Sequence, residues 1–180
     1  MLEDKLLIWK LKRGRLDALR QIYDQYKTDL LKVAISLTGD VGRSEDAVQD
    51  IFLKLIESHR RISIHSSLKH YLMTCLANRV RSLHRGDQRH GEILPPIPRS
   101  KASAGRPERW AMLDEEMRLV GRAMAQLPLE QREVVTLHVE AGLGFREIAR
   151  IQNASSNTVQ GRYRYGMEKL RSLLDSEVDT

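Results

Sequence analysis

Hydrophobic residues recur along this chain at steps of three and four, the spacing that places them on one side of an α-helix. The first long stretch of this kind predicts a helix of about 22 residues that begins at Leu16 and is closed by Gly39. A second predicted helix covers Ser44–Glu57, and a third runs from about Ser66 to Arg85. No segment has the alternation that favours a β-strand.

The middle of the chain lacks this period. Gly86–Pro107 holds three glycines and four of the five prolines, which is typical of a linker. As a flexible coil it would average about 25 Å between its ends, and about 70 Å if extended. Further helices are predicted at Glu108–Gln126 and Pro128–Glu140. We therefore expect an all-α fold, with small helical domains at 1–85 and 108–180 joined by a flexible linker at 86–107.

The last part of the chain has the pattern of a helix-turn-helix. A short helix at Phe145–Ile151 is followed by the turn Asn153-Ala154 and by Ser155, a residue suited to cap the start of the next helix. That next helix should bury one stripe, formed by Val159, Tyr163, Gly166, Leu170 and Leu173.

The opposite side of this last helix offers side chains that can reach base edges in the major groove of DNA. They are Asn157, Gln160, Gly161 and Arg164. A solvated face on an ordinary three-helix unit would have a similar composition. The spacing alone leaves both interpretations open.

Charge is concentrated between the two domains and at the end of the first. Residues 60–109 hold eleven basic and three acidic side chains, in a chain whose net charge is +6. Such a block indicates a polyanionic partner, and no strongly apolar helix face accompanies it, as a membrane surface would require. With no transmembrane run, no signal-peptide start and one cysteine, Cys75, we expect a cytoplasmic protein without membrane insertion.

The third predicted helix combines groups that suit single-stranded DNA. At helical spacing, one side carries an aromatic ring, a hydroxyl, an amide and two guanidinium groups: Tyr71, Thr74, Asn78, Arg81 and Arg85. Rings stack on bases, amides bind base edges, and cations follow the phosphates. A solvated polar face is the alternative.

The second predicted helix turns an acidic side outward. Its members are Asp46, Gln49, Asp50, Leu53 and Glu57, so that a leucine lies among polar groups. One exposed leucine is ordinary on a protein surface. A partner-binding face is the other interpretation.

Two groups of motifs resemble a known family. The first contains Glu45-Asp46-Ala47-Val48-Gln49-Asp50-Ile51-Phe52-Leu53 with Tyr71-Leu72 and Asn78, and the second contains Leu127-Pro128, Gln131-Arg132-Glu133-Val134, Glu147-Ile148-Ala149, Thr158-Val159 and Arg162. Together they resemble regions 2 and 4 of bacterial RNA polymerase sigma factors of the sigma-70 superfamily, extracytoplasmic-function (ECF) group.

The resemblance implies roles for these residues. Asp46, Gln49, Asp50 and Leu53 would bind the clamp helices of the large subunit of core RNA polymerase. Tyr71 and Asn78, with the loop Ser58–Ser67, would hold the displaced strand of the minus-ten element of promoter DNA. Thr158 and Arg162 join the helix that reads the minus-thirty-five element, and the family makes an anti-sigma factor an expected partner.

Three departures from the family pattern limit what can be carried over. Tyr71 stands where a tryptophan is more usual, Gln160-Gly161 replaces a basic residue and a serine, and the linker is basic rather than acidic. We expect no catalytic residues, no metal site and no cofactor. The alternative is a helix-turn-helix regulator that binds duplex DNA without core polymerase. An enzyme acting on nucleic acid is disfavoured, because the basic segment lacks paired carboxylates or a His/Cys cluster.

Overall fold

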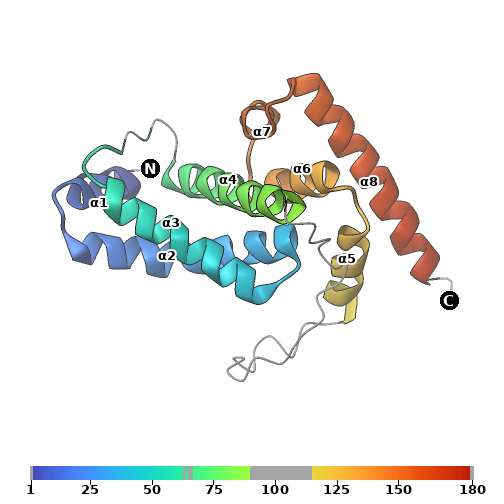
Figure 1. Ribbon diagram of the computed structural model, residues 1–180, viewed down its shortest axis with the longest axis horizontal. Helices are drawn as coiled ribbons and strands as arrows, with labels where there is room; N and C mark the ends of the chain where they lie inside the picture. The colour runs from blue at the N-terminus through green and yellow to red at the C-terminus, as the bar shows by residue number, and fades with distance from the viewer. Residues whose placement is uncertain (1, 63, 65–66, 90–114, 179–180) are drawn as a thin grey trace.

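The computed structural model describes residues 2–62, 64, 67–89 and 115–178, and within these ranges the chain is helical with no strand (Figure 1). The first half contains α1 (Leu2–Lys12), α2 (Leu16–Thr38), α3 (Val41–Ser58) and α4 (Leu68–Arg89). The second half contains α5 (Glu115–Ala125), α6 (Leu129–Val139), α7 (Phe145–Gln152) and α8 (Ser156–Val178). The all-α, two-domain architecture with a C-terminal helix-turn-helix is confirmed.

The connection between α2 and α3 is set by capping groups. Gly39 adopts a left-handed conformation with φ 70°, and its N–H donates to the carbonyl of Ile35. Asp40 then caps α3 by accepting from the N–H of Arg43 at 2.8 Å. The sequence predicted a later start at Ser44. That residue instead lies inside the first turns, where its buried hydroxyl donates to the carbonyl of Asp40.

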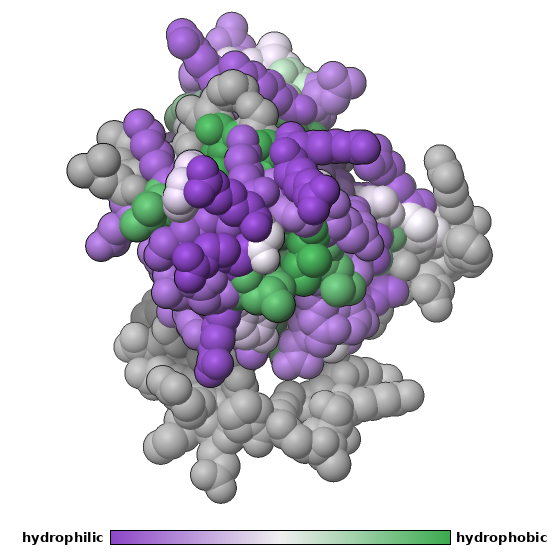
Figure 2. All heavy atoms as spheres, turned by 90° about the vertical axis from the view of Figure 1, so that its left-hand side faces the viewer, coloured by the Kyte–Doolittle hydropathy of each residue, from purple (hydrophilic) through white to green (hydrophobic). Residues whose placement is uncertain are grey.

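The helix α1 is absent from the sequence-based prediction. Its apolar residues are spread around the helix instead of forming one stripe, so no period marked it. Leu7 and Leu11 are nevertheless buried against the first half. Asp4 also accepts from the hydroxyl of Tyr26 at 3.0 Å and from the N–H of Leu68 at 3.3 Å, which ties α1 to α2 and to the start of α4. The end of the molecule that α1 helps to form is mostly hydrophilic, with a small apolar patch (Figure 2).

Helix α4 is longer than predicted. It continues through Gly86 to Arg89, into the segment assigned from sequence to the linker. A glycine inside a helix costs only about 1 kcal/mol relative to alanine, so one glycine need not end it. The rest of the predicted linker, residues 90–107, lies outside the described residues, as does the predicted helical segment 108–114.

The helix-turn-helix has the predicted turn chemistry. Asn153 ends α7 in the left-handed conformation with φ 49°, and the Ser155 hydroxyl accepts from the N–H of Thr158 at 3.0 Å. On α8, Val159 and Leu170 are buried as predicted. A methyl group on Gly166 would lie 3.1 Å from Val135, so this glycine permits the close packing of α8 on α6.

The two halves are packed against each other. One buried apolar cluster runs from Leu7 on α1 to Val159 on α8 and includes residues from both halves. Helix α6 lies against α2 and α4, and α7 also contacts α4 (Figure 1). The structure therefore joins the two halves through a shared interface.

Candidate nucleic-acid interface

The outward side of α3, here called the acidic face, consists of Asp46, Gln49, Asp50 and Leu53. Leu53 is 55 % exposed, and Asp46 and Gln49 are exposed with it. The opposite side of α3 is buried, as the sequence predicted. An exposed leucine surrounded by polar groups suits a partner that offers an apolar pocket with a basic rim.

The structure adds one apolar residue to this face. Ile56 is 40 % exposed and lies three positions after Leu53, on the adjoining turn of α3. Sequence reasoning missed it because Ile56 adjoins Leu55, a residue of the buried stripe. The two side chains together give the acidic face a larger apolar centre.

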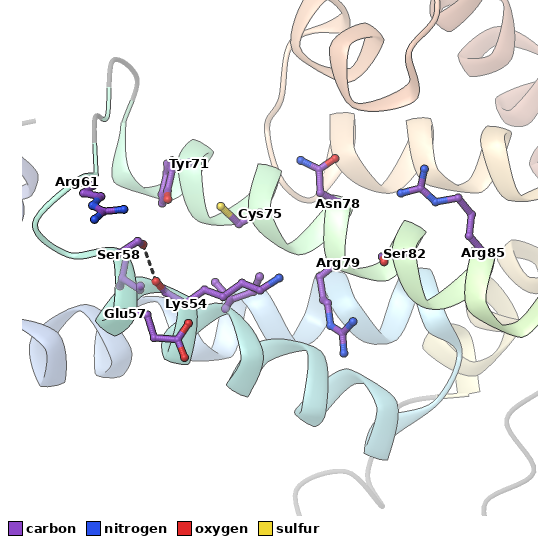
Figure 3. Close-up of a pocket in the computed structure, with 12 residues that line it drawn as sticks. Lys54, Glu57, Ser58, Arg61, Tyr71, Cys75, Asn78, Arg79, Ser82 and Arg85 are labelled. Atoms are coloured by element: carbon purple, nitrogen blue, oxygen red, sulfur yellow. Dashed lines mark hydrogen bonds between the residues drawn. The ribbon is translucent and has the colours of Figure 1, made fainter.

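A groove of about 660 Å³ lies between α3 and α4. Its lining consists of Ile51, Lys54, Leu55, Glu57, Ser58, Arg61, Tyr71, Cys75, Asn78, Arg79, Ser82 and Arg85. Figure 3 shows Tyr71, Asn78 and Arg85 along α4, with Arg61 reaching in from the segment after α3. Four of the lining residues are cations and one is a carboxylate, so the groove is basic.

Three of the five α4 residues that were predicted to bind single-stranded DNA line this groove. Tyr71, Asn78 and Arg85 line it, together with Cys75 and Ser82, at steps of four and three. Thr74 and Arg81 fit the helical spacing of the sequence equally well, but in the structure they lie on the adjoining stripe of α4 and do not line the groove. The Thr74 hydroxyl donates to the carbonyl of His70 at 2.8 Å, and Arg81 reaches the second half of the molecule.

The groove holds its aromatic ring and its thiol in neutral form. Burial and the neighbouring Cys75 raise the pKa of Tyr71 to about 12. Burial also raises the pKa of the Cys75 thiol above its usual value of 9.0. Neither group is negatively charged at neutral pH, so neither repels a phosphate. The ring is available for stacking on a base.

The reading face of α8 is largely open. Asn157, Thr158, Gln160 and Arg164 are exposed, and a side chain at half-buried Gly161 would meet nothing within 4 Å. The guanidinium of Arg164 lies 5.0 Å from the ring of Tyr165, which is itself exposed. These side chains can reach base edges, and the small Gly161 lets DNA approach the backbone.

Arg162 differs from its neighbours on α8. It is half-buried, and its Nη1 donates to Oε1 of Gln152 at 2.6 Å. Gln152 in turn donates through Nε2 to Oε2 of Glu133 at 2.7 Å and to the carbonyl of Glu130 at 3.0 Å. Arg162 therefore ties α8 to α7 and α6. Its guanidinium is engaged within the protein and not presented with the reading face.

Comparison with known proteins identifies the family. The model of Sigma-70 region 2 matches residues 22–90, and that of Sigma-70, region 4 matches residues 117–170. The ECF RNA polymerase sigma factor EcfG of Rhodopseudomonas palustris is 30% identical over 159 residues, which cover 88% of this chain and 86% of the relative. The chain belongs to the family of ECF RNA polymerase sigma factors. Its function is therefore that of a sigma factor in transcription initiation.

Other relatives of this ECF sigma factor agree. SigL of Mycobacterium tuberculosis is 28% identical over 163 residues, covering 87% of this chain and 88% of SigL. The sigma factor RpoE of Bartonella quintana was solved in complex with the anti-sigma factor NepR. Its structure matches this chain with a TM-score of 0.68 at 25% identity, and the match covers 87% of this chain and 96% of the RpoE chain. CnrH, solved with the cytosolic domain of CnrY, shares the fold with a TM-score of 0.69 at 22% identity, covering 97% and 98% of the two chains.

The described residues lack two further kinds of feature. Among these residues, no helix has the length and apolar character needed to cross a membrane. The same residues place no three His, Cys, Asp or Glu side chains together as a metal site.

Proposed function

We propose that this ECF sigma factor directs core RNA polymerase to promoters through three surfaces of one chain. The acidic face of α3 binds the polymerase, the reading face of α8 binds the upstream duplex, and the groove between α3 and α4 holds melted DNA. The observation that carries the proposal is the groove, which combines a neutral ring, an amide and four cations next to an acidic face. A protein that only binds duplex DNA needs neither this groove nor the acidic face.

The polymerase contact should be anchored by Leu53. Burial of a leucine side chain contributes about 1.5–3 kcal/mol, whereas exposed carboxylates mainly guide association and orientation. The clamp helices of the large subunit are the proposed partner surface. They would cover Leu53 and Ile56 and place their basic groups beside Asp46.

The melted strand should enter the groove base first. A base stacked on Tyr71 places its pairing edge near the amide of Asn78, while Arg61 and Arg85 lie where phosphates would pass. Stacking on an aromatic side chain contributes about 1–3 kcal/mol per base. This is enough to offset a large part of the cost of unstacking one base from a duplex.

The duplex contact should come from Asn157, Gln160 and Arg164. Amides and guanidinium groups form paired hydrogen bonds with adenine and guanine in the major groove. Thr158 is exposed beside them, and its hydroxyl lies 2.8 Å from that of Ser155. Arg162 serves chiefly to fix α8 on α7, because its guanidinium is bonded to Gln152.

The proposal extends to partners and location. Promoter DNA and core polymerase are the direct partners, and the chain works in the cytoplasm where both are found. It contributes no catalytic group or cofactor of its own, since RNA synthesis belongs to the polymerase. One structural neighbour, RpoE of Bartonella quintana, was solved in complex with the anti-sigma factor NepR, which supports an anti-sigma factor as a regulator.

Reconstituted transcription tests the proposal. Core polymerase and the purified chain are combined on a library of promoters, with core polymerase alone and the chain alone as controls. We expect specific initiation only when both are present, from promoters that share an upstream and a minus-ten element. Sequence-specific binding by the chain alone, unaffected by core polymerase and without initiation, would favour the helix-turn-helix regulator.

A further inference from the structure

Helix α8 carries two tyrosines close together, and only one of them serves the core. The ring centre of Tyr163 lies 5.1 Å from that of His138 on α6 and 5.4 Å from that of Phe145 on α7. The side chain of Tyr165, by contrast, is 55 % exposed. A tyrosine on the surface gives up the burial through which large aromatic side chains stabilise a fold. Tyr165 therefore calls for an explanation outside the packing of the domain.

The position of Tyr165 on α8 adjoins the reading face. Tyr165 follows Arg164 directly and lies four residues, about one turn, after Gly161. A methyl group added to Gly161 would meet nothing within 4 Å, so the tyrosine ring does not cover this glycine. The surface of α8 is consequently open at Gly161, with Tyr165 on the next turn. DNA that approaches the backbone at Gly161 comes close to Tyr165 as well.

The ring of Tyr165 holds the guanidinium of Arg164. The central carbon of the guanidinium lies over the ring at 5.0 Å from its centre, within the distance at which a cation is attracted to an aromatic face. Successive residues of a helix do not face each other, so Arg164 must bend toward Tyr165 to make this contact. The contact therefore restricts a long side chain that would otherwise turn freely in water.

A guanidinium above a ring can still bind a base. The contact with the ring uses the flat face of the group, whereas its N–H donors lie at the edge. Arg164 can therefore stay against Tyr165 while two of its donors bind O6 and N7 of guanine in the major groove. Arg162 instead uses one donor for Gln152 within the protein. Of these two arginines, Arg164 is the one whose partner leaves its donors available to DNA.

We propose that Tyr165 is a positioning residue for base recognition at the upstream element, an inference that rests on the proposed function. Its ring sets the direction of the Arg164 guanidinium in the free protein, so less side-chain freedom is lost when the guanidinium meets its base pair. The discrimination that Arg164 provides then depends on the ring of Tyr165 and not on its hydroxyl. The upstream sequence preferred by this sigma factor is set in part by a residue that need not touch a base.

Two substitutions at Tyr165 separate the ring from the hydroxyl. Tyr165→Phe keeps the ring, and Tyr165→Leu keeps an apolar side chain without a ring. Val139→Ala is the matched control, because Val139 is an apolar side chain that is 61 % exposed at the end of α6 in the same domain. Both Tyr165 variants should keep the helix content of the wild type in circular dichroism, since the side chain lies largely outside the core.

Binding of holoenzyme to duplexes that differ at single upstream base pairs gives the first readout. Tyr165→Leu should reduce discrimination about three- to tenfold at the base pair where Arg164→Ala reduces it, and leave the other base pairs unchanged. Tyr165→Phe and Val139→Ala should discriminate like the wild type. With Arg164→Ala already present, Tyr165→Leu should cause no further loss at that base pair.

NMR spectroscopy of the free protein gives a second readout, which needs no DNA. The ring current of an aromatic side chain shifts the signals of protons that lie over it. The side-chain protons of Arg164 should show this shift in the wild type and in Tyr165→Phe, but not in Tyr165→Leu.

The outcomes separate this inference from the proposed function. If Tyr165→Leu discriminates like the wild type, or weakens binding equally on every upstream sequence, the inference is overturned while the duplex contact stands. A loss of discrimination in Tyr165→Phe, or Arg164 protons without the ring-current shift, overturns it too. If the shift is present but wild-type holoenzyme has no upstream preference, the proposed duplex contact fails, and the specificity role of Tyr165 fails with it.

Discussion

Arg79 places both Nε and Nη2 at 2.6 Å from Oδ2 of Asp50. This ion pair joins the groove, which Arg79 lines, to the acidic face, which contains Asp50. The charge of Asp50 is thereby largely matched within the protein. We infer that Asp46 supplies more of the field that guides polymerase, and that the docking energy comes mainly from Leu53.

Leu53→Asp should abolish co-purification with core polymerase while the helical fold is kept. The side chain is 55 % exposed, so a charge there does not enter the core, but it would be buried in the complex. Leu16→Asp is the matched control, because Leu16 is 75 % exposed at the start of α2, away from the acidic face. Loss of helix content in Leu53→Asp would mean that Leu53 stabilises the fold and that the face is misassigned.

Arg164→Ala should relax the preference for particular upstream base pairs. A paired hydrogen bond from a guanidinium to guanine contributes about 1–3 kcal/mol of discrimination. The measurement is binding of holoenzyme to a set of upstream variants at fixed salt. Equal weakening on every sequence would show that Arg164 contacts only phosphate.

Arg162→Ala should act first on stability. Its removal leaves Oε1 of buried Gln152 without its donor, at a cost of about 1–3 kcal/mol. We expect a lower free energy of unfolding in urea, and a loss of DNA binding that is equal across upstream sequences. Unchanged stability with altered base preference would instead assign Arg162 to the reading face.

The thiol of Cys75 should report on occupancy of the groove. Because burial raises its pKa, less thiolate is present at pH 8 than for a free cysteine, and alkylation should be slower. The rate should rise with pH up to and beyond 9, the direction expected for a raised thiol pKa. In the holoenzyme, binding of a pre-melted promoter should slow the alkylation of Cys75 further. If the thiol reacts as fast with DNA bound as a fully exposed cysteine does, the melted strand lies elsewhere.

The pattern of apolar residues predicted most of the helices. Most residues assigned inward are buried, although Tyr163 and Leu173 on α8 are half-buried and Leu16 at the start of α2 is exposed. It could not predict α1, whose apolar residues surround the helix, or the start of α3, where Asp40 competes with Ser44 as the cap. Helical spacing also allowed two stripes on α4, both of which contain Tyr71. One includes Thr74 and Arg81, and the other includes Cys75 and Ser82. Packing against α3 and α6 separated Asn78 and Arg85 from Thr74 and Arg81.

The interface between the domains left no signal in the sequence. In the sequence, Glu133 was only part of a motif that resembles the family, and Arg162 was assigned to the helix that reads DNA. Only the placement of α4 against α6 brings Arg81 to Glu133, and this placement depends on contacts between residues 52 positions apart. Local periodicity carries no information about such pairs.

Open-complex formation by Asn78→Ala tests the central claim that the chain captures melted promoter DNA. The exposed amide of Asn78 carries no charge, so its loss should leave holoenzyme assembly and upstream duplex binding unchanged. Asn157→Ala on α8 is the matched control and should weaken upstream binding instead. We predict that Asn78→Ala is impaired on fully duplex promoters and partly recovers on templates pre-melted at the minus-ten element, because unstacking is then already complete. Normal transcription by Asn78→Ala from fully duplex promoters would contradict this account.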